Sequence, residues 1–133
     1  MNYLIDTNIC IYLMNKKPLE VIEKIKNTEI SQIGISTITV SELKYGVAKS
    51  KYQKQNSKRL DEFLIPFEIL PYDEAASNYY GMIRSQLESE GKVIGPLDML
   101  IAAHALSKDL ILVTNNEKEF LRIKSLKVEN WAQ

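Results

Sequence analysis

The chain has 133 residues, of which 45% are hydrophobic and 26% charged, and its formal net charge is zero. This composition is typical of one globular domain, and the zero net charge argues against a protein that coats nucleic acid through bulk electrostatics. The single cysteine, Cys10, excludes an internal disulfide and a cysteine-rich zinc site. Because no apolar run could span a bilayer and the N-terminal residues lack a basic leader, we expect a cytoplasmic protein without a membrane partner.

Short apolar strands alternate with helices along the chain, and no repeat or linker interrupts them. This alternation predicts an α/β fold in which a mainly parallel sheet carries helices on both faces. In chain order the pattern predicts a strand at 3–5, helices at 7–15 and 18–27, a strand at 33–36, helices at 39–49 and up to about residue 64, a strand at 67–70, a helix after Asp73, a helix opened by Gly95 and Pro96, a strand at 110–113, a short helix at 118–121 and an edge strand near Val128.

Polar clusters directly follow two of the predicted strands. The sequence Asp6-Thr7-Asn8 comes after the strand at 3–5, and Thr114-Asn115-Asn116 comes after the strand at 110–113. In open parallel sheets the ligand site lies outside the carboxyl ends of the strands, where the strand order reverses. The two clusters therefore predict a shared polar site.

Three acids are candidates for that site. Asp6 ends a strand, Glu42 lies within a helix, and Asp98 lies in the first turn of the helix that Gly95 opens. For Asp98 alone, a favourable interaction with the helix dipole is the simpler interpretation. If the three carboxylates converge, however, they repel one another unless a cation lies between them, and oxygen ligands favour Mg²⁺ or Mn²⁺ over zinc.

Gly46 and His104 qualify this picture. Gly46 lies four residues after Glu42, on the same helix face, and one reason to keep a helix-weakening glycine there is space beside the carboxylate. His104, the only histidine, is about 120° around its helix from Asp98, so we interpret it as a packed side chain and not as a ligand. Its position also argues against Ser-His-Asp and Cys-His mechanisms.

Basic residues concentrate in residues 43–60, which hold six of them and no acid, whereas residues 61–98 hold eight acids and two basic residues. Such a run is usually a solvated helix face, and the alternative is a surface that faces a polyanion. In the second case Tyr45 and Tyr52, which lie among the lysines, would stack on bases. The six basic residues are Lys44, Lys49, Lys51, Lys54, Lys58 and Arg59.

Four segments, "YLIDTN", "ISTITVSELKYG", "GPLDMLIAAHAL" and "LILVTNNEKEF", occur in an order and spacing that resembles the PIN-domain ribonucleases. Among these the chain is most similar to the VapC toxins of bacterial toxin–antitoxin pairs, over essentially its whole length. The resemblance implies a single nuclease domain over 1–133, folded as a three-layer α/β/α sandwich with a central, mainly parallel sheet. It also implies that Asp6, Glu42 and Asp98 bind Mg²⁺, for which Mn²⁺ could substitute.

The resemblance further implies that Thr7, Asn8 and Thr114 are supporting polar groups. Much of the family has another acid after the strand predicted here at 110–113, where this chain has Asn115 and Asn116. We expect Glu119 to substitute for that acid, and Asn116 is the alternative occupant of the fourth position.

The function that the resemblance implies is endoribonucleolytic toxicity. A metal-activated water would cleave structured RNA, with tRNA as the substrate and the initiator anticodon loop as the target, and thereby inhibit translation. The resemblance also implies homodimers and a cognate VapB-type antitoxin that blocks the site. The residues expected to contact RNA or the antitoxin are Lys44, Tyr45, Lys49, Lys51 and Lys54.

Two other functions remain open at this level. A Mg²⁺-dependent phosphatase of doubly wound topology commonly carries a D-x-D motif after its first strand, whereas Thr7 and Asn8 follow Asp6 here. A non-catalytic RNA- or protein-binding module of the same fold would have lost its chemistry. The presence of all three acids argues against that second alternative.

Overall fold

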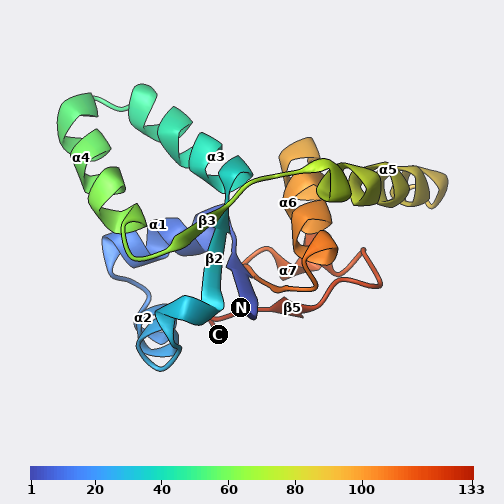
Figure 1. The fold of residues 1–133 in the computed structure, drawn as a ribbon, viewed down its shortest axis with the longest axis horizontal. Helices are drawn as coiled ribbons and strands as arrows, with labels where there is room; N and C mark the ends of the chain where they lie inside the picture. The colour runs from blue at the N-terminus through green and yellow to red at the C-terminus, as the bar shows by residue number, and fades with distance from the viewer.

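A five-stranded parallel sheet lies at the centre of the protein, which the computed structural model describes over residues 1–133 (Figure 1). The strand order is β3-β2-β1-β4-β5, and every neighbouring pair is parallel. The strands are β1 (Tyr3–Ile5), β2 (Ile33–Ser36), β3 (Glu68–Leu70), β4 (Ile111–Val113) and β5 (Val128–Glu129). The predicted α/β fold with a parallel sheet is confirmed.

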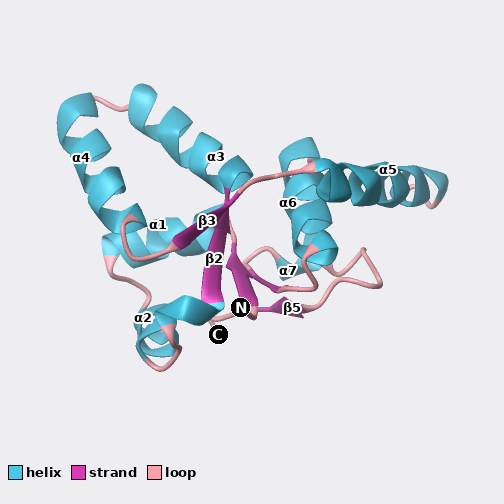
Figure 2. Cartoon of the chain, in the orientation of Figure 1, coloured by secondary structure: helices cyan, strands magenta, loops and turns pink.

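Seven helices connect and cover these strands (Figure 2). They are α1 (Thr7–Asn15), α2 (Leu19–Lys26), α3 (Thr37–Ala48), α4 (Gln53–Leu64), α5 (Glu74–Ser89), α6 (Pro96–Ser107) and α7 (Glu117–Phe120). A 3₁₀ turn at Ile30–Gln32, before β2, was not predicted. Helix α3 begins two residues earlier than expected because the Ser36 hydroxyl accepts a hydrogen bond from the Ile38 N–H at 3.1 Å.

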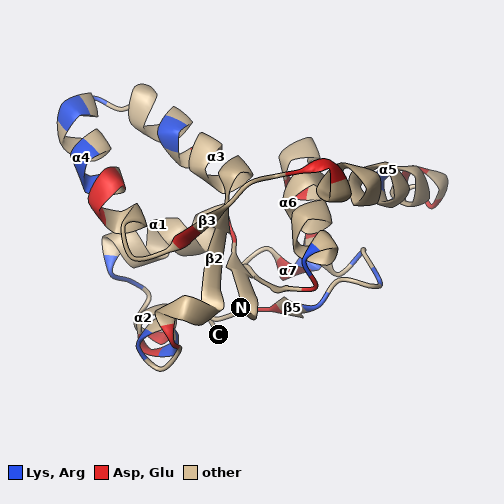
Figure 3. Cartoon of the chain, viewed as in Figure 1, with Lys and Arg blue, Asp and Glu red and all other residues tan.

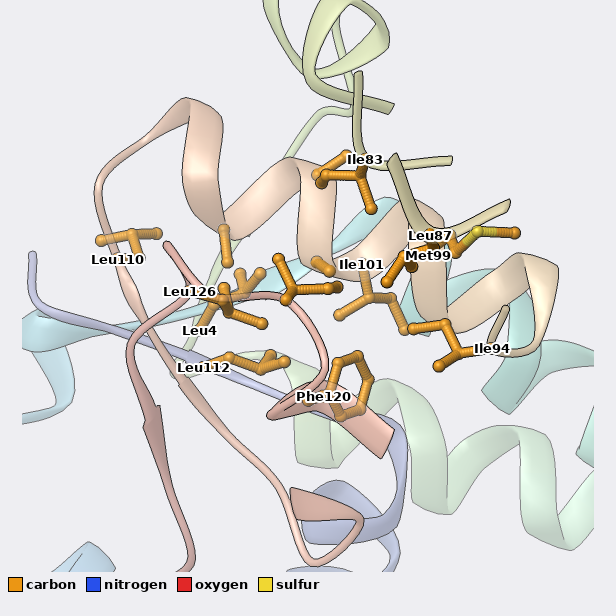
Figure 4. Close-up of a cluster of buried hydrophobic side chains, with 14 residues drawn as sticks. Leu4, Ile83, Leu87, Ile94, Met99, Ile101, Leu110, Leu112, Phe120 and Leu126 are labelled. Atoms are coloured by element: carbon orange, nitrogen blue, oxygen red, sulfur yellow. The ribbon is translucent and has the colours of Figure 1, made fainter. Parts of the chain in front are cut away.

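Hydrophobic side chains fill the space on both faces of the sheet. Leu4 and Leu112 belong to one buried cluster, together with residues of α5, α6 and α7 (Figure 4). Their neighbours Ile5 and Val113 belong to a second cluster, with residues of α1, α2, α3 and α4. Since successive side chains of a strand point to opposite faces, these two clusters are the two interfaces of a three-layer sandwich.

The strand order reverses between β1 and β4. The chain passes from β1 to β2 and β3 on one side, and later returns to β4 and β5 on the other. Such a reversal leaves a crevice at the carboxyl ends of the two central strands. Asp6 follows β1 and Thr114 follows β4, so both residues lie at that crevice.

His104 is a packed core side chain, as predicted. It is fully buried, its Nδ1 lies 2.7 Å from Ser36 Oγ, and its ring meets that of Tyr72 edge to face at 5.7 Å. Burial lowers the pKa of His104, so it is neutral at physiological pH. None of the helices combines the length and the apolar character that crossing a membrane requires.

Candidate active site

Asp6 is the most deeply buried of the candidate acids. It is 4% exposed, and it caps α1 by accepting a hydrogen bond from the Thr7 N–H at 2.7 Å. Its other oxygen accepts a hydrogen bond from the Thr114 hydroxyl at 2.8 Å, across the crevice between β1 and β4. Burial raises the pKa of Asp6, the two hydrogen bonds oppose this rise, and the charge of Glu42 adds to it. The carboxylate therefore has one orientation, set by two donors.

Glu42 approaches the same crevice from α3. Its Oε1 accepts a hydrogen bond from the Thr7 hydroxyl at 2.7 Å, and that hydroxyl lies 3.5 Å from Thr39 Oγ1. Thr7 thus contacts two acids, Asp6 through its N–H and Glu42 through its hydroxyl. Thr39 was not predicted as part of the site, although its position three residues before Glu42 places it on the same helix face.

Asp98 lies in the first turn of α6, where Gly95 is the N-cap and Pro96 the first helical residue. Its pKa is raised to about 7 because it is partly buried and because the charges of Asp6, Glu119 and Glu42 all act on it. A helix N-terminus by itself would stabilise the ionised form. Partial burial and the neighbouring carboxylates together therefore outweigh the helix dipole at this position.

Asn116 and Glu119 complete the cluster from the segment after β4. The Asn116 side-chain amide donates to Glu119 Oε2 at 3.0 Å and approaches Asp98 Oδ2 at 3.5 Å. Its backbone N–H donates to the Thr114 hydroxyl at 2.9 Å. The structure thus brings both candidates for the fourth position to Asp98, with the amide of Asn116 lying between two carboxylates.

The other predicted residues lie outside this cluster. Asn8 Oδ1 accepts from the Asn115 N–H at 3.4 Å, so its polar contact is to the loop after β4. Lys44, Tyr45, Lys49, Lys51 and Lys54 lie on the surface of α3, of α4 and of the turn between these helices. None of the five forms a salt bridge; the three salt bridges of the protein are Arg84–Glu88, Lys108–Asp73 and Lys127–Asp109.

The donor set suits a hard divalent cation. The site offers only carboxylate oxygens, and no salt bridge compensates their charge. These oxygens belong to Asp6, Glu42, Asp98 and Glu119. In the structure, however, no group of three or more Asp, Glu, His or Cys side chains has the arrangement of a closed metal-binding set. The carboxylates are coupled through their charges, and a cation would have to draw them together.

Sequence comparison now identifies the family to which this arrangement belongs. The family model for the PIN domain matches residues 3–126. The chain belongs to the PIN-domain family. It is 47% identical to the ribonuclease VapC2 of Rickettsia felis over 98% of both chains, and 39% identical to the tRNA(fMet)-specific endonuclease VapC of Shigella flexneri over 99% of both. Within the PIN-domain family it therefore groups with the VapC ribonucleases, which argues against the phosphatase alternative.

Solved structures of PIN-domain proteins have the same fold. The VapBC complex of Salmonella typhimurium, solved bound to DNA, contains a chain that superposes with a TM-score of 0.93 at 39% identity, over 98% of each chain. The three-layer architecture and the parallel sheet are therefore those of the family. PIN-domain nucleases in general depend on divalent metal ions, which agrees with the oxygen-only donor set described above.

Proposed function

We propose that this protein is a Mg²⁺-dependent endoribonuclease in which Asp6, Glu42 and Asp98 hold the metal ion. The observation that carries the proposal is the raised pKa of Asp98, about 7, in a cluster of carboxylates that no basic side chain neutralises. A cluster of this kind is typical of a functional site, because a structural role would favour compensated charge. Mn²⁺ would substitute for Mg²⁺ at the same oxygens.

The bound metal would lower the pKa of a water molecule and stabilise the charge that develops on the attacked phosphate. The chain's own residues would orient the ligands. Thr114 and the Thr7 N–H hold the two oxygens of Asp6, and the Thr7 hydroxyl holds Glu42. Asn116 donates toward Glu119 and Asp98, so it limits their rotation. We assign these residues and Asn8 supporting roles.

The proposed substrate is tRNA, cut in an unpaired loop. The Shigella flexneri relative is named a tRNA(fMet)-specific endonuclease, and at 39% identity the same substrate class is the best inference for this chain. Proteins read RNA sequence mainly in loops, where unstacked bases are accessible. Cleavage of the initiator anticodon loop would stop translation, which gives the protein the effect of a toxin.

We also propose that a VapB-type antitoxin regulates the protein and that the protein itself is a homodimer. The solved relatives from Rickettsia felis and Salmonella typhimurium are VapBC complexes, which supports the antitoxin partner. The homodimer follows from the family resemblance alone. Light scattering of the purified chain, with and without its co-expressed antitoxin, measures both assemblies.

The test of the proposed function is a cleavage assay on total tRNA. The native protein should cut tRNA with Mg²⁺ or Mn²⁺ and lose this activity in excess EDTA. Sequencing of the new ends should map them to one anticodon loop. The variant Asp6→Asn should lose about 100-fold or more of the rate, because a metal contributes several kcal/mol to charge stabilisation. Cleavage that persists in EDTA, or in Asp6→Asn at the native rate, would contradict the proposal.

A further inference from the structure

Two clefts adjoin the candidate active site on the side of Glu42. Thr7, Ile11, Glu42 and Gly46 line both of them. The first cleft, of about 510 Å³, extends toward Tyr45, Lys49 and Leu97, whereas the second extends toward α4. The volume of the first cleft lies within the range of roughly 300 to 1,000 Å³ that is usual for ligand sites. We call this first cleft the Gly46 cleft, because Gly46 lies where it meets the second cleft.

Gly46 has no packing reason to be glycine. It lies inside α3, where glycine is less favourable than alanine, and a Cβ built on it would meet nothing within 4 Å. Gly81, inside α5, has the same free space but lines neither cleft. The two glycines are thus alike in their helices and differ in what surrounds them. Only at Gly46 does the missing side chain widen a cleft that reaches a candidate catalytic carboxylate.

Tyr45 and Lys49 give the Gly46 cleft an aromatic and cationic wall. The Tyr45 side chain is 65% exposed, and the Lys49 Nζ lies 4.9 Å from the centre of its ring. Neither Lys49 nor any other basic residue of α3 and α4 forms a salt bridge. Figure 3 shows Lys and Arg on α3 and the first half of α4, while acids mark the start of α5. An exposed ring beside unpaired lysines is the combination that binds single-stranded nucleic acid.

We propose that the Gly46 cleft binds one unpaired nucleotide next to the scissile phosphate of the RNA. Its base would stack on Tyr45, its phosphate would lie near Lys49, and its sugar would pass over Gly46 toward Glu42. The proposal rests on the proposed ribonuclease function and names the part of the chain that selects unpaired RNA. Tyr45 and Gly46 are then specificity residues, distinct from the carboxylates.

Continuity and charge favour RNA over a peptide as the occupant of this cleft. Glu42 and Thr7, which belong to the acidic site, also line the Gly46 cleft, so a strand cut at the acidic site would pass beside this cleft. The unpaired positive charge of Lys44 and Lys49 on α3 complements a phosphate backbone. An apolar peptide would use neither charge.

The test compares Gly46→Ala with Gly81→Ala. Each should raise the melting temperature by about 3 to 5 °C, because alanine is the better helix former in a domain of this size. Fluorescence anisotropy in excess EDTA then measures binding of a labelled single-stranded RNA and of a duplex RNA, without cleavage. Gly46→Ala and Tyr45→Leu should weaken single-strand binding about 10-fold and leave duplex binding unchanged, since stacking needs an unpaired base. Gly81→Ala should bind both RNAs as the native protein does.

Lys49→Gln provides the second measurement. It should weaken binding of both RNAs and lower the slope of log affinity against log salt by about 0.7 on single strands, because one phosphate contact is lost. In the tRNA assay with Mg²⁺, Gly46→Ala should raise KM more than it lowers kcat.

Native-like single-strand binding by Gly46→Ala and Tyr45→Leu would overturn the proposal. So would equal losses on single-strand and duplex RNA. If these variants keep RNA binding and lose only a co-expressed VapB-type antitoxin, the cleft docks a protein and the proposal is wrong. A native protein that binds single strands through Tyr45 but cleaves no tRNA with any metal would contradict the proposed function and support the cleft, so the two failures are distinguishable.

Discussion

Asp73 and Asp98 lie at the starts of α5 and α6, two helices that pack against each other. Asp73 accepts a hydrogen bond from the Ala76 N–H at 3.1 Å and lies 2.9 Å from the Lys108 ammonium. The hydrogen bond to Lys108 lowers the pKa of Asp73 most, and the hydrogen bond from Ala76 lowers it further. At Asp98, partial burial and the neighbouring carboxylates raise the pKa to about 7.

This contrast separates a structural acid from a functional one. Both helix N-termini favour a negative charge, so the dipole cannot explain why the two pKa values move in opposite directions. The surroundings explain it, since Asp98 is partly buried among acids, whereas Asp73 is exposed and bonded to a cation. Asp73 is placed where its charge stabilises the fold, whereas the charge of Asp98 is unfavourable until a proton or a bound cation neutralises it.

The largest effect on RNA cleavage should come from removing the charge of Asp98. Asp98→Asn should lower metal-dependent RNA cleavage by about 100-fold or more, because several kcal/mol of charge stabilisation depend on the metal. The metal-free variant should be as stable as the native protein, or more so, since repulsion is removed. Mg²⁺ should raise the melting temperature of the native protein, and this increase should shrink in the variant.

Asp73→Asn is the matched control for that experiment. It keeps a side chain that caps helices well but loses the ion pair with Lys108, so it should lower the melting temperature slightly and leave cleavage intact. Thermal melts with and without Mg²⁺, together with the cleavage assay, compare the two variants. An Asp98→Asn protein that cuts RNA at the native rate would remove the distinction between these aspartates.

A smaller effect should follow from disturbing an orienting group. Thr114→Val removes the hydroxyl that donates to Asp6 and accepts from Asn116. It should lower the free energy of unfolding by about 1 to 3 kcal/mol and cleavage by about 10- to 100-fold. Thr28→Val is the control, because the Thr28 hydroxyl donates to a backbone carbonyl of α2 far from the site. Denaturant unfolding and cleavage rates measure both. Native-like cleavage by Thr114→Val would show that Asp6 needs no orienting hydroxyl.

A further difference between the two aspartates should appear in the pH dependence of stability, where cleavage is not involved. Asp98 has a folded pKa of about 7 against an ordinary value of 3.8, so the folded state binds a proton that the unfolded state has lost between these values. Stability of the metal-free protein should therefore fall as pH rises from about 4 to 7. Asp73 has a lowered pKa, and its contribution is present above the ordinary value of 3.8 and lost as pH falls below it.

Melts across pH 3 to 8 in EDTA check these opposite signs. Asp98→Asn should flatten the fall toward pH 7, and Asp73→Asn should flatten the loss at acidic pH. Mg²⁺ should restore the stability lost near neutral pH, because it competes with the proton for the same oxygens. A native profile that rises between pH 4 and 7 would contradict the repulsion assigned to Asp98.

Hydrophobic periodicity and helix-capping residues predicted the helices and strands well. The strands are short and apolar, and α5 and α6 have clear starts at Asp73 and Gly95. Asp6 could be placed from the end of its strand. Glu42 could be named as a candidate but not placed, because nothing local shows which face of α3 turns toward β1, and the family resemblance supplied its role. The fourth position stayed undecided because Asn116 and Glu119 lie on a four-residue helix and its cap, where loop geometry decides direction.

The hydrogen bond from Thr114 to Asp6 joins residues 108 positions apart in the chain. Asp6 follows β1, whereas β4 and the segment with Asn116 and Glu119 come only after β2, β3 and α6 in chain order. Until β4 docks beside β1, the carboxylate of Asp6 lacks the Thr114 donor, and Asp98 lacks Asn116 and Glu119. The acidic cluster is consequently complete only once β4 pairs with β1, although three of its carboxylates precede β4 in the chain.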